Sequence, residues 1–156
     1  MEYTDPKLNA WVGIDPGAMG ACALLNENDH YDILDWEDEF VLSEAISEWK
    51  EIYNIKIVVV EAQHSMPKQG VSSTFKFGTN YGLIRGVLAA QKEHTELVSP
   101  LVWQRAMLHN ADGPDTKSRS LVSARRHFPN LQLKKSQHGR SDAILMSLFA
   151  KRRFPL

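Results

Sequence analysis

The chain has 156 residues, of which 43% are hydrophobic and 24% charged, as in ordinary globular proteins. We expect this length to form one domain, residues 1–156, with a sizeable core. A single cysteine, Cys22, excludes an internal disulfide and a cysteine-based zinc site. No apolar run approaches the about 20 residues of a membrane span, and the acidic N-terminus does not resemble a signal peptide, so we expect a cytoplasmic protein.

The net charge of −1 conceals an uneven distribution of charge along the chain. Residues 1–60 carry thirteen acidic and three basic side chains, whereas residues 61–156 carry six acidic and fifteen basic ones. A chain divided in this way can present one basic face, which favours a polyanionic partner. The alternative is that the surfaces differ in sign without a functional reason.

The first part of the chain reads mainly as strands. Residues 1–9 are polar, and we expect them to be frayed. Alternating or continuous apolar runs predict strands over residues 11–26, 31–36, 38–42, 56–60 and 96–98. A glycine-rich turn interrupts the first of these, which resumes at Ala21. The run Lys56–Val60 is typical of a strand buried on both faces, and it ends in Glu61.

Helices dominate the rest of the chain. Residues 62–70 and 110–115 read as loops. Helices are predicted over residues 43–53 with Ser43 as N-cap, 72 to about 92, from Ser99-Pro100 onward, 116–127, and about 141–152. Strands first, then alternating helices and strands, predict an α/β fold. We expect a mixed five-stranded sheet, with three antiparallel strands followed by parallel strands, flanked by helices.

The segment Trp11–Gly20 places a carboxylate, Asp15, inside a buried strand beside Gly13 and Gly17. An ionised Asp among apolar neighbours is costly to bury unless a cation or a hydrogen-bond donor satisfies it. The glycines leave the backbone bare, so a divalent metal with an attached phosphate could approach closely. The segment equally allows a hairpin in which Asp15 bonds only turn amides.

Two further acids stand at comparable positions, Glu61 after the buried strand and Asp142 at the start of the last helix, with His138 four residues earlier. Mg²⁺ and Mn²⁺ prefer oxygen ligands, and two such ions about 3.5–4 Å apart can activate a water for phosphodiester cleavage. A histidine can ligate a metal or carry a proton. Alone, Glu61 could cap a loop, Asp142 could serve the helix dipole and His138 could be a surface residue. The hypothesis rests on these three residues acting together with Asp15.

Three segments resemble motifs of the RuvC family of Holliday-junction resolvases, which belong to the RNase H-like superfamily. They are Gly13–Gly17, Val58–Glu61 and His138–Ala143, and the Glu61–Gly70 loop is similar to that of phage-type members. The resemblance covers residue 11 to about residue 150. It implies an RNase H-like fold and a nuclease with two Mg²⁺ or Mn²⁺ ions, held by Asp15, Glu61, His138 and Asp142 as catalytic residues. Products would carry a 5′-phosphate and a 3′-hydroxyl, and a phage-encoded member would act in the host cytoplasm.

The sequence departs from the family pattern at two places. Bacterial members space the last pair of motif residues by three positions, whereas His138 and Asp142 are four apart. Bacterial members also have Gln directly after the Glu, whereas Ala62 separates Glu61 from Gln63 here. The role of His138 and any cut-site preference are therefore not carried over.

Basic and aromatic residues gather downstream of Glu61, where a phosphate backbone would be held beside bound metal. The candidate nucleic-acid-binding residues are His64, Lys68, Lys76, Arg85, Lys117, Arg119, Lys134, Lys135 and Arg140. Phe75 and Phe77 lie near the loop where the family inserts side chains into the junction. One of them could stack on an unpaired base, although we expect core packing for at least one.

Three glycines, Gly78, Gly82 and Gly86, recur at helical spacing in the predicted helix over residues 72–92. Each costs about 1 kcal/mol relative to alanine inside a helix, so close helix packing is expected along this stripe. The packing could lie within the chain or across a two-fold homodimer interface, which would present two sites to a four-way junction.

The leading interpretation is a structure-selective endonuclease that resolves Holliday junctions and branched DNA. One alternative is an RNase H-like nuclease acting on structured RNA or another nucleic acid. Another is a non-catalytic junction-binding module. An actin-like or sugar-kinase-like ATPase also opens with Gly-Ile-Asp, but that fold needs a duplicated domain and a much longer chain.

Overall fold

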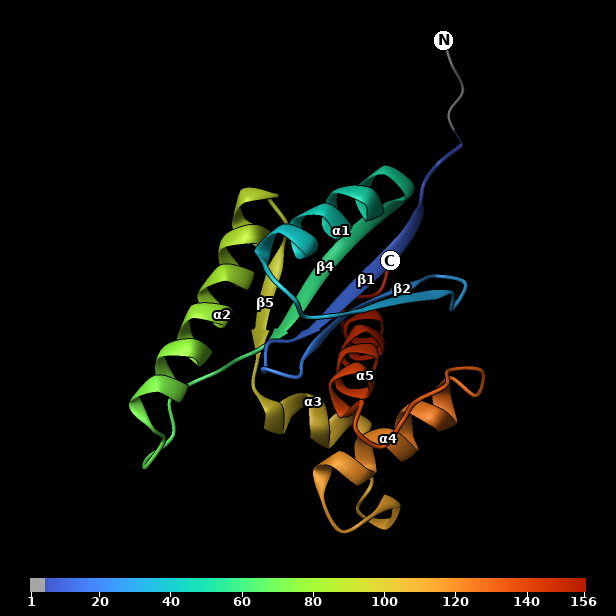
Figure 1. The fold of residues 1–156 in the computed structure, drawn as a ribbon. Helices are drawn as coiled ribbons and strands as arrows, with labels where there is room; N and C mark the ends of the chain where they lie inside the picture. The colour runs from blue at the N-terminus through green and yellow to red at the C-terminus, as the bar shows by residue number, and fades with distance from the viewer. Residues whose placement is uncertain (1–4) are drawn as a thin grey trace.

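A computed structural model of the chain describes residues 5–156 (Figure 1). One mixed sheet has the strand order β3-β2-β1-β4-β5. Its strands are β1 (Leu8–Asp15), β2 (Ala21–Asn26), β3 (Tyr31–Asp35), β4 (Tyr53–Glu61) and β5 (Thr95–Val98). The first three pair antiparallel, whereas β1 with β4 and β4 with β5 pair parallel. The expected α/β sheet of three antiparallel strands followed by parallel strands is confirmed.

Helices cover both faces of this sheet. They are α1 (Glu39–Ile52), α2 (Val71–Ala90), α3 (Pro100–Met107), the short 3₁₀ helix η1 (Asn110–Asp112), α4 (Thr116–His127) and α5 (His138–Arg153). The helices α1 and α2 pack on one face, and α5 packs on the other with α3 and α4 outside it (Figure 1). Within residues 5–156, no helix is both long and apolar enough to cross a lipid bilayer.

Several predicted boundaries were wrong. Residues 39–42 are not a strand but the beginning of α1, because the Asp38 side chain accepts the Val41 N–H at 2.9 Å and caps the helix in place of Ser43. Helical spacing then buries Leu42, Ile46 and Trp49 together. Residues 11–26 were predicted as one strand interrupted by a glycine-rich turn, and they form two antiparallel strands joined by that turn.

The N-terminal and C-terminal elements also differ from the prediction. Leu8 and Asn9 belong to β1 rather than to a frayed end, and residues 1–4 lie outside the described part of the chain. The helix α5 begins at His138, about one turn before the predicted Ser141.

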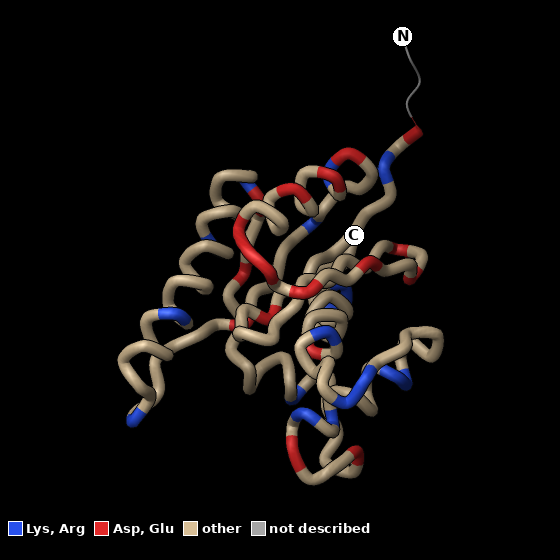
Figure 2. The backbone as a smooth tube through the Cα atoms, viewed as in Figure 1, with Lys and Arg blue, Asp and Glu red and all other residues tan. Residues whose placement is uncertain are grey.

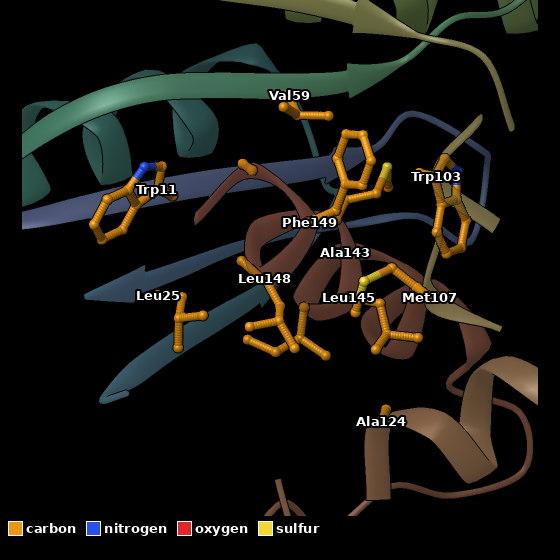
Figure 3. Close-up of a cluster of buried hydrophobic side chains, with 14 of the residues drawn as sticks. Trp11, Leu25, Val59, Trp103, Met107, Ala124, Ala143, Leu145, Leu148 and Phe149 are labelled. Carbon is orange, nitrogen blue, oxygen red and sulfur yellow. The ribbon is translucent and has the colours of Figure 1, made fainter. Parts of the chain in front are cut away.

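Alternation along the central strands sets which layer each side chain meets. Trp11 of β1 and Val59 of β4 enter the core against α5, and Figure 3 shows both among the buried side chains of that core. Val12 and Val60 enter the opposite core, against α1 and α2. Because successive strand residues face opposite ways, Asp15 and Glu61, two residues beyond Gly13 and Val59, face the α5 layer.

Candidate active site

Asp15 and Glu61 lie side by side at the same end of the sheet. Their strands are parallel neighbours in which Ile14 pairs with Val60, so the next residue of each strand is a carboxylate. Adjacent strands are about 4.8 Å apart, which is close enough for two carboxylates on one face to repel each other strongly. The register of β1 and β4 therefore creates the acidic pair.

The N-terminal part of α5 brings Asp142 to this pair, because Gly13 lets the helix approach β1. A Cβ atom at Gly13 would collide with main-chain atoms of Ala143, Met146 and Ser147. At Gly139 it would collide with the Met19 carbonyl, in the turn that follows Asp15. The helix is therefore seated on β1 by backbone contact, directly beside the residue that follows Asp142 in the sequence.

Hydrogen-bond donors hold the first two carboxylates. Asp15 Oδ1 accepts the Gly17 N–H at 3.0 Å, so the turn bond allowed by the sequence does form, on one oxygen. Glu61 Oε2 accepts the Trp103 indole N–H at 2.7 Å, and Glu61 Oε1 accepts the Gln63 amide at 2.8 Å. Burial is the main cause that raises the pKa of both acids, and the Asp15 charge raises that of Glu61 further. Trp103 and Gln63 act in the opposite direction.

Asp142 is the most strongly perturbed of the three acids. Burial, followed by the charge of Asp15, raises its pKa from 3.8 to about 8, and Glu61 contributes in the same direction. The Ser120 hydroxyl donates to Asp142 Oδ1, and Lys117 is near enough to lower the pKa. Asp15 raises the pKa of both Glu61 and Asp142, and Glu61 raises that of Asp142. Three segments far apart in the sequence therefore bring their carboxylates into one electrostatic cluster.

The chemistry of this donor set fits a hard divalent cation. Within residues 5–156, no Lys, Arg or His nitrogen lies within 4.0 Å of Asp15, Glu61 or Asp142. Three partly buried carboxylates without a cationic partner offer only oxygen ligands, as Mg²⁺ and Mn²⁺ prefer. In the described residues, no group of three or more His, Cys, Asp or Glu side chains is arranged so that it could hold a metal ion. In each of the three acids, at least one carboxylate oxygen accepts a hydrogen bond.

His138 begins α5 and is half-buried. Burial lowers the pKa of its imidazole, and the Lys117 charge lowers it further, so the ring is neutral at pH 7. Its carbonyl accepts the Ser141 hydroxyl at 2.8 Å, but no described hydrogen bond or ion pair connects its ring to the three acids. A neutral imidazole one turn from Asp142 retains the capacity to ligate a metal or carry a proton.

Most predicted nucleic-acid-binding residues are exposed. Figure 2 shows Lys and Arg along α4, the loop leading to α5 and the N-terminal end of α2, whereas Asp and Glu follow α1 and the strands β2 and β3. The exposed candidates are His64, Lys68, Lys76, Arg85, Lys117, Lys134 and Lys135. Two guanidinium groups are already engaged within the chain: Arg140 pairs with both Asp35 oxygens at 2.7 and 3.0 Å, and Arg119 donates to the Gly113 carbonyl at 2.8 Å.

The helix α2 leaves an apolar face uncovered. Phe75 is 77% exposed, and Phe77 is half-buried but belongs to neither core cluster, so the expected core packing of one of them is wrong. A Cβ atom at Gly78, Gly82 or Gly86 would meet nothing within 4 Å. Packing within the described chain therefore does not require these glycines.

Sequence reasoning missed three features that shape the site. Trp103 and Ser120 come from α3 and α4 to hydrogen-bond Glu61 and Asp142, and the contact of Gly13 with α5 seats the third acid. A buried tryptophan usually needs an acceptor for its N–H, so Trp103 carried a detectable signal. Ser120 carried none, since serine is common on helix surfaces.

The search of solved structures finds proteins with the same arrangement of elements. Thermus thermophilus RuvC in complex with a Holliday junction substrate has a TM-score of 0.60 and 14% identity, covering 93% of this chain and 96% of that one. A second Thermus thermophilus RuvC structure gives 0.60 and 13%, covering 92% and 96%. The fold is RuvC-like. No protein-family model and no curated protein matches the sequence. The expected RNase H-like architecture is thus confirmed at the level of the RuvC-like fold.

Proposed function

We propose that this chain is a metal-dependent endonuclease, formed by one domain over residues 1–156, that cuts four-way and other branched DNA by phosphodiester hydrolysis. The observation that carries the proposal is the cluster of Asp15, Glu61 and Asp142, three coupled carboxylates that no cationic side chain of residues 5–156 neutralises. The RuvC-like fold supports it, because a solved protein with this fold is bound to a Holliday junction. The Glu61–Gly70 loop supports a phage-type member.

Asp15, Glu61 and Asp142 would hold two Mg²⁺ or Mn²⁺ ions, with His138 as a further ligand or a proton carrier. When bound, such ions supply an activated water and stabilise the leaving oxygen. The carboxylates would orient the ions and would have to be ionised to do so, which the raised pKa of Asp142 opposes in the absence of metal. The neutral imidazole of His138 can accept a proton at pH 7.

The exposed lysines around the site would hold the phosphate backbone. Lys68 lies in the loop after Glu61, and Lys134 and Lys135 lie in the loop before α5. Lys117 is close enough to influence Asp142 electrostatically. No ion pair within residues 5–156 engages these four ammonium groups, so all are available to phosphates.

The uncovered face of α2 supports a homodimer. The glycine stripe Gly78–Gly86 retains helix-destabilising residues that packing within the chain does not require, and a partner helix could approach the bare backbone there. At the N-terminal end of the same helix, Phe75 is exposed, where it could stack on an unpaired base at the centre of a junction. A two-fold dimer would present one site to each of two symmetric strands.

The test is cleavage of a synthetic four-way junction with Mg²⁺ or Mn²⁺, compared with a linear duplex and a structured RNA. We expect junction nicking by the wild type and a loss of at least about 100-fold in Asp15→Asn, because one metal ligand contributes several kcal/mol to transition-state stabilisation. Asp5 is an exposed aspartate, so Asp5→Asn is the matched control and should cut the junction normally.

Three results would contradict the proposal in different ways. Normal cutting by Asp15→Asn, with unchanged binding, would remove Asp15 from the chemistry. Selective cleavage of the RNA would favour the structured-RNA nuclease. Tight junction binding without any metal-dependent cleavage would favour a binding module.

A further inference from the structure

Trp103 lies outside the acidic cluster of Asp15, Glu61 and Asp142 but hydrogen-bonds one of its members from the core. Its side chain is 0% exposed, and it belongs to the core cluster that includes Met107 and Phe149 (Figure 3). From there its indole N–H reaches Glu61 Oε2 at 2.7 Å. An indole N–H only donates, so this contact fixes one acceptor oxygen of the carboxylate.

Gln63 secures the other oxygen, at 2.8 Å, but from a loop. The two donors together constrain the rotation of the Glu61 carboxylate. Because Trp103 is packed in the core on α3 while Gln63 follows β4 on an irregular segment, Trp103 is the rigid member of the pair.

The other tryptophan hydrogen bonds of the described residues lie elsewhere. Trp11 donates to the Phe154 carbonyl at 2.7 Å, and Trp49 donates to Asp32 Oδ2 at 2.8 Å. Trp49 therefore makes the same type of bond, an indole N–H to a carboxylate, outside the acidic cluster. It provides a matched control for Trp103.

We infer that Trp103 is a positioning residue, which holds the Glu61 carboxylate in the orientation that receives a divalent metal. The inference rests on the proposed function, since it concerns how the same site takes up its ions. Residues that hydrogen-bond a ligating carboxylate commonly change metal affinity by about 10–100-fold when removed, although they never touch the metal. Trp103 thus acts through Glu61 and is not itself a ligand.

The first arm of the test uses nuclear magnetic resonance of the isotope-labelled, full-length protein without metal. The chain has four tryptophans, whose indole N–H signals can be assigned by single substitutions. Glu61→Gln should move the Trp103 signal and leave the Trp49 signal in place. Addition of Mg²⁺ to the wild type should again move the Trp103 signal alone of these two. A Trp103 signal that responds to neither change would overturn the inference, even if Trp103→Phe failed to fold.

The second arm measures Mn²⁺ binding by calorimetry for Trp103→Phe and Trp49→Phe. We expect a dissociation constant about 10–100-fold weaker in Trp103→Phe and a change below about twofold in Trp49→Phe. Equal affinities in folded variants would overturn the positioning role while leaving the nuclease proposal intact. Absence of Mn²⁺ binding by the wild type would overturn the proposed function, and the positioning role with it, even with the Trp103–Glu61 signal present.

Discussion

Gly13→Ala tests whether the contact between β1 and α5 assembles the acidic cluster. The added methyl would lie within the main-chain atoms of Ala143, Met146 and Ser147, which cannot rotate away as a flexible side chain would. Overpacking of a core costs about 1–3 kcal/mol, and a clash with backbone belongs at the upper end. For a chain of this size, about 3 kcal/mol corresponds to a fall in melting temperature of about 6–12 °C.

The same displacement should damage activity more than stability. Asp142 directly precedes Ala143, so a shift of α5 away from β1 moves Asp142 away from Asp15. A misplacement of about 1 Å in a catalytic group can reduce the rate about 100-fold. We therefore expect junction cleavage by Gly13→Ala to fall about 100-fold at temperatures where the variant is folded, as judged by circular dichroism.

Gly82→Ala is the control for packing within the chain, because the same methyl meets nothing within 4 Å there. Since Gly82 also lies in the proposed dimer interface, the melting temperatures are compared at protein concentrations where the chain is monomeric. Alanine is the better helix former by about 1 kcal/mol, so this variant should melt higher than the wild type. A Gly13→Ala protein that melts within about 2 °C of the wild type and cleaves at the wild-type rate would refute the argument, since the helix would not need its close seat on β1.

Three further predictions concern titration, association and salt. Because folding raises the pKa of Asp142 from 3.8 to about 8, the metal-free folded state binds more protons than the unfolded state in this window, and stability should fall as the pH rises through it. The melting temperature of the wild type should therefore depend on pH more steeply in this window than that of Asp142→Asn, and equal pH dependences would contradict the raised pKa. The Mn²⁺ affinity of the wild type, measured by calorimetry, should rise over the same pH range. Gly86→Leu should leave the chain folded, since its Cβ has open space, but should dissociate the proposed dimer in sedimentation experiments; an unchanged dimer would place the interface elsewhere. Lys134→Ala combined with Lys135→Ala should reduce the slope of log affinity against log salt by about 2 for junction DNA, and an unaltered slope would separate these lysines from the phosphates.

The architecture could be predicted from the sequence because its central strands are strongly apolar. Lys56–Val60 could be read as a doubly buried strand that ends in Glu61, from its apolar run alone. Asp15 was predicted to lie within the first strand, whereas it is the last residue of β1. The order of strands and helices then sufficed to predict a mixed sheet. The start of α1 was misread because Phe40, Val41 and Leu42 form a short apolar run that also suits a strand. The decisive bond, from the Val41 N–H to the Asp38 carboxylate, is a capping signal over only three residues.

The residues that hydrogen-bond the acidic cluster could not be predicted from the sequence, because they come from segments far from the acids along the chain. Trp103 is 42 residues from Glu61, and Ser120 is 22 residues from Asp142. No local pattern links such pairs, since their contact depends on how α3 and α4 pack around α5. The exposed glycine stripe shows the reverse case, in which a pattern was visible in the sequence but the described chain supplies no partner for it.

The separation of acidic and basic residues onto different sides gives the molecule a large electric dipole despite its net charge of −1 (Figure 2). The electric field of a polyanion exerts a torque on such a dipole, so the protein turns its basic α4 side toward the polyanion before the two molecules make contact. With a Debye length of about 8 Å at physiological salt, this alignment operates only over the last nanometre of approach. It selects among encounters that have already occurred rather than drawing the molecules together from afar.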